Sequence, residues 1–146
     1  MVEQTTPYGL STTIAAEFAD AVSRAKAALA AQGFGVLAEM NIAATLRDKL
    51  QVPFRDYVIL GACMPALAHQ ALLAETDIGL LLPCNVIVYA TDDPRRSVVA
   101  ALDPVAALSL TGNEAIRPLA DEVKRSLRSV LDAVEQDTGS VAERSA

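Results

Sequence analysis

The residues best suited to chemistry in this chain are its thiols and its imidazole, and they occur close together. The sequence holds two cysteines, Cys63 and Cys84, and a single histidine, His69. A thiol can act as a nucleophile or form a disulfide, and thiols with an imidazole can bind a soft metal ion. The segment between Tyr57 and Tyr89, which contains all three residues, is therefore the first place to look for a site.

Both cysteines stand at the ends of predicted strands. Cys63 comes shortly after Gly61, and Cys84 lies between Pro83 and Asn85. A disulfide would require Cα atoms within about 7 Å of each other. Because free cysteine is among the most frequently buried residue types, we favour two small apolar core residues, with a reactive thiol as the alternative.

His69 and Glu39 are the remaining polar candidates. His69 follows Cys63 on a predicted helix that Pro65 begins, where the missing N–H of proline costs nothing. The spacing of this Cys and His matches no recognised ligand pattern, so we predict no metal site and expect a surface or helix-packing histidine. Glu39 is expected to face solvent from a half-exposed strand. Both residues remain candidates for ligand binding.

The common catalytic templates are absent from the sequence. It has no GxGxxG, Walker A, HExxH, CxxC or GxSxG pattern. This absence favours a role without catalysis and assigns no cofactor, although it leaves enzymatic activity open.

Composition favours a folded domain with an aliphatic core. Of the 146 residues, 52% are apolar, 21% are charged and 4% are aromatic. The net charge of -6 repels phosphate backbones, so nucleic acid is not expected as a partner. The first residues lack the basic and apolar regions of a secretory signal, and the apolar runs are too short to span a bilayer. A cytoplasmic protein without membrane contact is therefore expected.

Hydrophobic periodicity predicts one α+β domain over residues 8–136, with flexible termini at 1–7 and 137–146. The expected order is β-α-β-α-β-α-β-β-α, and its closing hairpin favours a mostly antiparallel sheet of four to five strands with helices packed on it. Strands are expected at 10–14, 34–40, 57–63, 85–90 and 97–102. Helices are expected at 15–32, 41–52, 66–75 and 116–136, with a short helical turn within 103–112.

These patterns predict the side-chain orientations of one strand and two helices. In the strand 34–40, the even-numbered residues should share one face, with Glu39 on the other. Arg24 should face solvent on the first helix, and the helix that Asn41 caps should turn Leu46 and Leu50 inward.

Several segments together resemble a known family. They include G-F-G-V at 33–36, I-L-G-A-C-M-P at 59–65, G-L-L-L-P-C-N-V-I-V-Y at 79–89, and the later Asp103-Pro104. From about Tyr8 to Gln136 the chain resembles the bacterial and archaeal family called domain of unknown function 302. The resemblance implies a compact α+β domain, similar to half of a TATA-binding protein, that pairs into dimers, and it implies no established reaction. Family members usually carry an acidic residue where this chain has Asn41, so no role is built on a carboxylate there.

These observations lead to one main hypothesis and two alternatives. We expect a small dimeric module that binds a small apolar or thiol-reactive ligand near Cys63, Pro65, Pro83, Cys84 and Asn85, because ligand sites often open at strand ends. Cys84 and Asn85 are predicted to line an accessible crevice. One alternative is a thiol-dependent redox protein or enzyme that uses Cys84 or Cys63. The other is a purely structural dimerisation or interaction domain.

Overall fold

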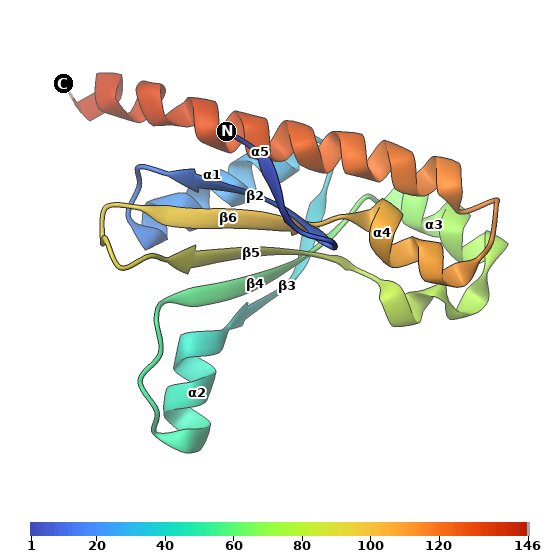
Figure 1. Cartoon of the computed structure of the whole chain (residues 1–146), viewed down its shortest axis with the longest axis horizontal. Coiled ribbons are helices and arrows are strands. Elements are labelled where there is room, and N and C mark those ends of the chain that lie inside the picture. The colour runs from blue at the N-terminus through green and yellow to red at the C-terminus, as the bar shows by residue number, and fades with distance from the viewer. Residues whose placement is uncertain (146) are drawn as a thin grey trace.

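A six-stranded antiparallel sheet forms the centre of the computed structural model, which describes the backbone of residues 1–145 and the side chains of residues 1–136 (Figure 1). The strand order across the sheet is β1-β2-β6-β5-β4-β3, and each neighbouring pair is antiparallel. The strands are β1 (Glu3–Thr6), β2 (Gly9–Ile14), β3 (Gly35–Asn41), β4 (Tyr57–Cys63), β5 (Cys84–Ala90) and β6 (Ser97–Leu102).

Five α-helices and two short 3-10 helices connect and cover the strands. The α-helices are α1 (Phe18–Ala31), α2 (Ile42–Leu50), α3 (Pro65–Ala74), α4 (Pro104–Leu108) and α5 (Arg117–Ser145). The 3-10 helices are η1 (Thr76–Leu81) and η2 (Ser109–Thr111). Helices α1 and α5 pack on each other and on the same face of the sheet (Figure 1).

The main core lies between that sheet face and the two helices. Alternate strand residues point into it because side chains alternate across a strand. The sheet contributes Leu10, Leu60, Val86, Val88 and Val99, all nearly inaccessible to solvent. Helix α5 contributes Leu127, Val130, Leu131 and Val134, whose spacing places them on one side of the helix.

A smaller core stands at one end of the sheet, where α3, η1 and α4 meet the first turns of α5. Its buried members are Ala71, Ile78, Leu108, Ile116 and Ala120. Asp103 fixes this end, because its buried carboxylate accepts hydrogen bonds from the backbone N–H groups of Val105 and Ala106 and from the Lys124 ammonium. The small core therefore holds α3 at the ends of β4 and β5.

The sequence-based fold class is confirmed, with a correction to the strand count. The sheet is antiparallel, and β5 and β6 form the expected hairpin. The sixth strand is β1, whose residues E-Q-T-T are too polar and too few to give a strand pattern; β1 is ordered by pairing with β2. Helix α5 continues to Ser145, beyond the predicted end at Gln136. Side chains of residues 137–146 lie outside the described part, so their predicted flexibility stays a prediction.

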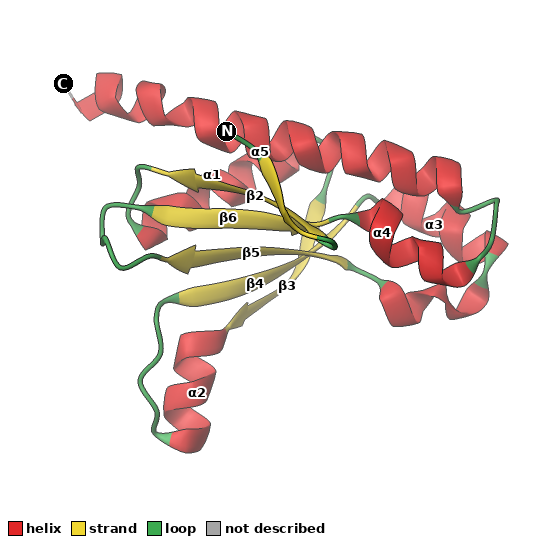
Figure 2. Ribbon diagram, viewed as in Figure 1, coloured by secondary structure: helices red, strands yellow, loops and turns green. Residues whose placement is uncertain are grey.

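Three predicted orientations are wrong. The register of β3 shifts between Val36 and Ala38, so the even-numbered residues of this strand do not share one face. Helix α2 buries none of its residues, and Leu50 is 64% exposed, because α2 stands away from the sheet (Figure 2). Arg24 is 6% exposed and pairs with Asp20 at 2.6 Å, because it lies on α1 among the residues that the packed side of this helix buries.

Candidate functional site

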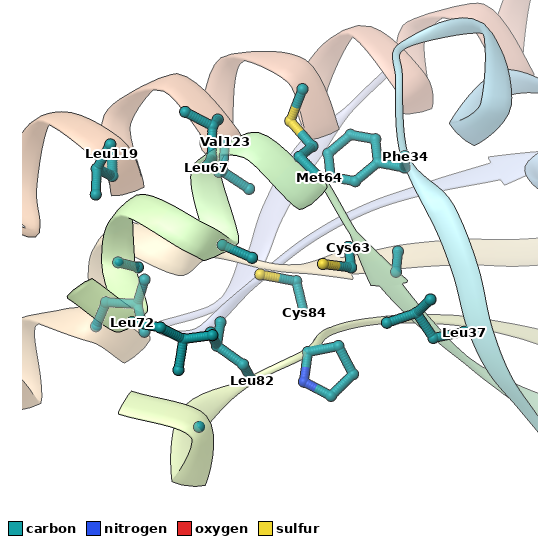
Figure 3. Close-up of a pocket in the computed structure, with 16 residues that line it drawn as sticks. Phe34, Leu37, Cys63, Met64, Leu67, Leu72, Leu82, Cys84, Leu119 and Val123 are labelled. Atoms are coloured by element: carbon teal, nitrogen blue, oxygen red, sulfur yellow. The ribbon is translucent and has the colours of Figure 1, made fainter. Parts of the chain in front are cut away.

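An apolar cavity of about 270 Å³ lies at the junction of the two cores, where the ends of β4 and β5 meet α3 and α5 (Figure 3). Its wall carries no charged side chain and no side-chain nitrogen or oxygen atom. The lining residues are Phe34, Leu37, Ala62, Cys63, Met64, Leu67, Ala68, Ala71, Leu72, Gly79, Leu82, Pro83, Cys84, Leu108, Leu119 and Val123. Leu37 and Leu72 are 69% and 42% exposed, so the cavity reaches the protein surface beside them.

The two cysteines meet on the wall of this cavity. Ala62 is directly opposite Cys84 in the antiparallel pair, which makes Cys63 and Cys84 diagonal neighbours on adjacent strands. Both are free thiols, and Figure 3 shows both sulfur atoms pointing toward α3. The sequence left the proximity of the two thiols open, and the pairing of β4 with β5 places them side by side.

The cavity environment keeps Cys84 neutral. Burial, and secondarily the neighbouring Cys63, raises the pKa of the Cys84 thiol from 9.0 to about 11. A thiol with this pKa is protonated at neutral pH, whereas a reactive cysteine needs a lowered pKa and access to solvent. Cys84 therefore contributes a small polarizable surface to the cavity, and its environment does not favour the thiolate chemistry of the redox alternative.

Gly61 leaves room for Pro83 to pack against β4 at the wall of the cavity. A Cβ atom at Gly61 would lie 3.0 Å from Cγ of Pro83, a tight contact that would require the proline ring to shift. The Leu82–Pro83 peptide bond is cis, and Pro83 follows directly after the 3-10 helix η1 and the lining residue Leu82. The absence of a side chain at Gly61 therefore lets Pro83 lie close against β4 where it lines the cavity.

The remaining predicted residues lie elsewhere. Asn85 points to the opposite face of the sheet from Cys84, because the two are consecutive in a strand. Pro65 is the first residue of α3 and His69 is exposed on the same helix, and neither lines the cavity. Glu39 forms an ion pair with Lys26 of α1. The predicted crevice shared by Cys84 and Asn85 is therefore two separate surfaces.

Most of the cavity wall comes from residues that sequence reasoning assigned to the core or left unassigned. Leu119 and Val123 of α5 carry the same apolar spacing as the buried residues that follow them, yet they are only partly buried. Leu72 has a comparable position on α3. Apolar spacing is the signal that marks these positions, but it does not distinguish a core contact from a cavity wall.

Neither a metal-binding cluster nor a membrane-spanning helix is found in the described part of the chain. In the described part of the chain, no three His, Cys, Asp or Glu side chains gather in a way that could hold a metal ion. Among the same residues, no helix combines the length and hydrophobicity needed to cross a bilayer.

The fold and cavity together define a small α+β domain whose antiparallel sheet carries two helices on one face and an apolar cavity at one end. The family described as "Domain of unknown function DUF302" matches residues 10–134, and the chain belongs to that family. The structure is similar to the crystal structure of an uncharacterized conserved DUF302 protein from Bacillus stearothermophilus, with a TM-score of 0.79 and 23% sequence identity. The alignment covers 86% of this chain and 97% of that chain. No curated protein matches the chain.

Proposed function

We propose that this protein binds a small, uncharged, apolar ligand in the cavity between β4, β5, α3 and α5. The observation that carries the proposal is a cavity of about 270 Å³ whose entire wall is apolar or thiol. An enclosed apolar cavity of about 150 Å³ is enough to bind a benzene-sized molecule. This cavity is larger and would hold a substituted ring or a short alkyl chain.

The chemistry of the wall supports a neutral ligand over a charged one. A charged group moved into this cavity would lose its hydration and find no counter-ion on the wall, and the only side-chain hydrogen-bond donors there are the weak thiol groups of Cys63 and Cys84. Cys63 and Cys84 add polarizable sulfur, which makes favourable contacts with aromatic rings. A cytoplasmic location, where such thiols stay reduced, is part of this proposal.

Filling the cavity tests the proposal. Ala68 lines the cavity from α3, whereas Ala66 is exposed on the same helix and does not line it. In thermal-shift titrations with toluene, naphthalene and n-hexanol, at least one probe should stabilise the wild type and the Ala66→Phe control but fail to stabilise Ala68→Phe. Stabilisation of the wild type and Ala68→Phe to the same extent, or of neither the wild type nor Ala66→Phe by any probe, would contradict it.

We further propose that the protein acts as a homodimer through the arm formed by residues 40–54, which comprises the end of β3, α2 and the loop after it. Figure 2 shows this arm extending from the sheet. Its exposed large apolar residues are Met40, Leu50, Val52 and Phe54, each at least 42% accessible. Such clustering of apolar side chains is typical of an interaction surface.

A second copy of the chain is the partner that charge favours. The last turn of α2 carries Arg47 and Lys49 beside Asp48, which gives residues 40–54 a net charge of +1, while the chain as a whole has a net charge of -6. The basic end of the arm is therefore attracted to the acidic remainder of another copy. Two copies related by a twofold axis would each cover the arm of the other.

Sedimentation equilibrium at roughly tens of micromolar protein tests this proposal. The wild type should sediment as a dimer, and Leu50→Glu should sediment as a monomer because a charge would enter the apolar contact. Leu110 is 78% exposed in η2, away from the arm, so Leu110→Glu is the matched control and should remain dimeric. A monomeric wild type, or a dimeric Leu50→Glu, would refute the arm as the interface.

A further inference from the structure

A second cavity, of about 330 Å³, lies on the sheet face opposite α1 and α5. It is bounded by the β1–β2 turn, by β2, β6 and β5, and by the start of β4. It shares no lining residue with the apolar cavity, and its wall is mixed, with phenol, hydroxyl and amide groups beside aliphatic side chains.

All three tyrosines of the chain line this cavity, although they come from three separate segments. Tyr8 lies in the β1–β2 turn, Tyr57 begins β4, and Tyr89 is near the end of β5. The rings of Tyr57 and Tyr89 are stacked, with centroids 5.4 Å apart and planes 9° from parallel. Burial, followed by the nearby Tyr89 and Tyr8 groups, raises the pKa of Tyr57, so its hydroxyl is a hydrogen-bond donor at neutral pH.

The fold fixes Tyr8 beside the cavity even though 63% of this residue is exposed. Its carbonyl oxygen accepts a hydrogen bond of 2.7 Å from the backbone N–H of Asp103. Its own N–H donates to Oγ1 of Thr6 at 3.3 Å. These two contacts hold the backbone of Tyr8 at the cavity rim, so a ligand there would not have to order this part of the chain.

Asn85 supplies the amide of the cavity. It is exposed, and within the part of the chain that the structure describes its side chain makes no hydrogen bond to protein. An amide offers both a donor and an acceptor, so it can pair with a carboxamide or a similar group of a ligand. Ile87, between Asn85 and Tyr89 on the same strand face, gives an apolar floor between the amide and the rings.

The geometry points to a second binding site, in which the three tyrosines and Asn85 take an uncharged aromatic molecule that carries a carboxamide or similar hydrogen-bonding group. Ring stacking against the Tyr57–Tyr89 pair favours a planar ligand, since aromatic rings prefer offset or edge contacts with one another. The wall contains no charged side chain, so a charged ligand would have no counter-ion there. The site is independent of the apolar cavity and does not rest on the function proposed for it.

Nuclear magnetic resonance of protein with isotope-labelled tyrosine rings tests the site, because all three tyrosines of the chain lie in it. Nicotinamide and benzamide are the probes, and cyclohexanecarboxamide, which keeps the amide without the aromatic ring, is the matched control. The expected result is a saturable shift of the Tyr57 and Tyr89 signals in the millimolar range for at least one aromatic probe. The control should bind at least about tenfold more weakly.

Two variants locate the binding. Asn85→Ala should weaken it about tenfold by removing the amide partner, and the exposure of Asn85 allows this variant to fold. Ala68→Phe, which fills the apolar cavity, should leave probe binding in the tyrosine-lined cavity unchanged. The two proposed sites can therefore be refuted independently of each other. The inference is overturned if neither aromatic probe gives a saturable shift, if the control binds equally well, or if Asn85→Ala binds as the wild type does. Tyrosine shifts that follow protein concentration instead of probe concentration would also overturn it, because they would indicate a contact between copies.

Discussion

Asp103 should be one of the most sensitive polar positions for stability. Its side chain is 3% exposed and makes contacts in two directions. It caps α4 by accepting from the N–H groups of Val105 at 3.0 Å and Ala106 at 3.3 Å. It also accepts from Nζ of Lys124 on α5 at 2.9 Å. The residue therefore joins the end of β6 to the helix that covers the sheet.

The expected loss for Asp103→Ala is about 3 kcal/mol. Removing an N-cap costs about 1 kcal/mol, and losing a hydrogen bond between charged groups costs about 2 kcal/mol. Lys124 is 32% exposed and can reach water once its partner is gone, so no penalty for a buried unpaired charge is added. Asp103→Asn should cost only about 1 kcal/mol, because asparagine caps helices as well as aspartate and keeps a neutral bond to Lys124.

Equilibrium unfolding in urea at pH 7, followed by far-ultraviolet circular dichroism with the thiols kept reduced, measures both losses. A double-mutant cycle of Asp103→Ala with Lys124→Met isolates the ion pair and should give a coupling of about 1–2 kcal/mol. The reasoning is refuted if Asp103→Ala costs less than about 1 kcal/mol, or if the alanine and asparagine variants are equally destabilised.

Three further predictions concern the apolar cavity and its surroundings. Cys84→Ala should lower the free energy of unfolding by about 1 kcal/mol because Cys84 is 6% exposed, whereas Asn85→Ala, at an exposed position, should change it by less than about 0.5 kcal/mol. A lower urea midpoint for Asn85→Ala than for Cys84→Ala would contradict the assignment of Cys84 as buried and Asn85 as exposed. Because the folded-state pKa of Cys84 is raised to about 11, its contribution to stability is complete below pH 9.0 and is lost as pH rises toward 11, so the wild type should lose more stability over this window than Cys84→Ala does. Parallel urea titrations at several pH values check this, and equal slopes for the two proteins would rule it out. Gly61→Ala places a Cβ 3.0 Å from Pro83 and should cost about 1–3 kcal/mol, while Gly79→Ala, which meets no atom within 4 Å, should be nearly neutral in the same assay.

The local order of the elements could be predicted well because it depends on nearest neighbours in the sequence. Continuous apolar runs bounded by Pro83 and the polar turn at 91–96 marked β5 and β6, and the i, i+3, i+4 spacing from Val123 onward marked α5. The same reasoning missed β1, whose polar residues form a strand only because β2 offers an edge to pair with. It also predicted wrongly that α2 packs its apolar residues against the core. An apolar stripe on a helix predicts a buried face, but it does not specify whether the same chain or another one covers that face.

For the candidate site, the sequence placed Cys63 and Cys84 at strand ends. The predicted crevice shared by Cys84 and Asn85 was wrong, because a side-chain period of two turns these consecutive residues to opposite faces of the sheet. Tertiary structure alone decided that β4 and β5 are neighbours and that the two thiols border an apolar cavity of about 270 Å³. That volume depends on how far α3 and α5 stand from the ends of β4 and β5, a distance set by the Asp103–Lys124 contact and the small core. Likewise, the meeting of Tyr8, Tyr57 and Tyr89 depends on strand register across the sheet, a long-range property that no local pattern encodes.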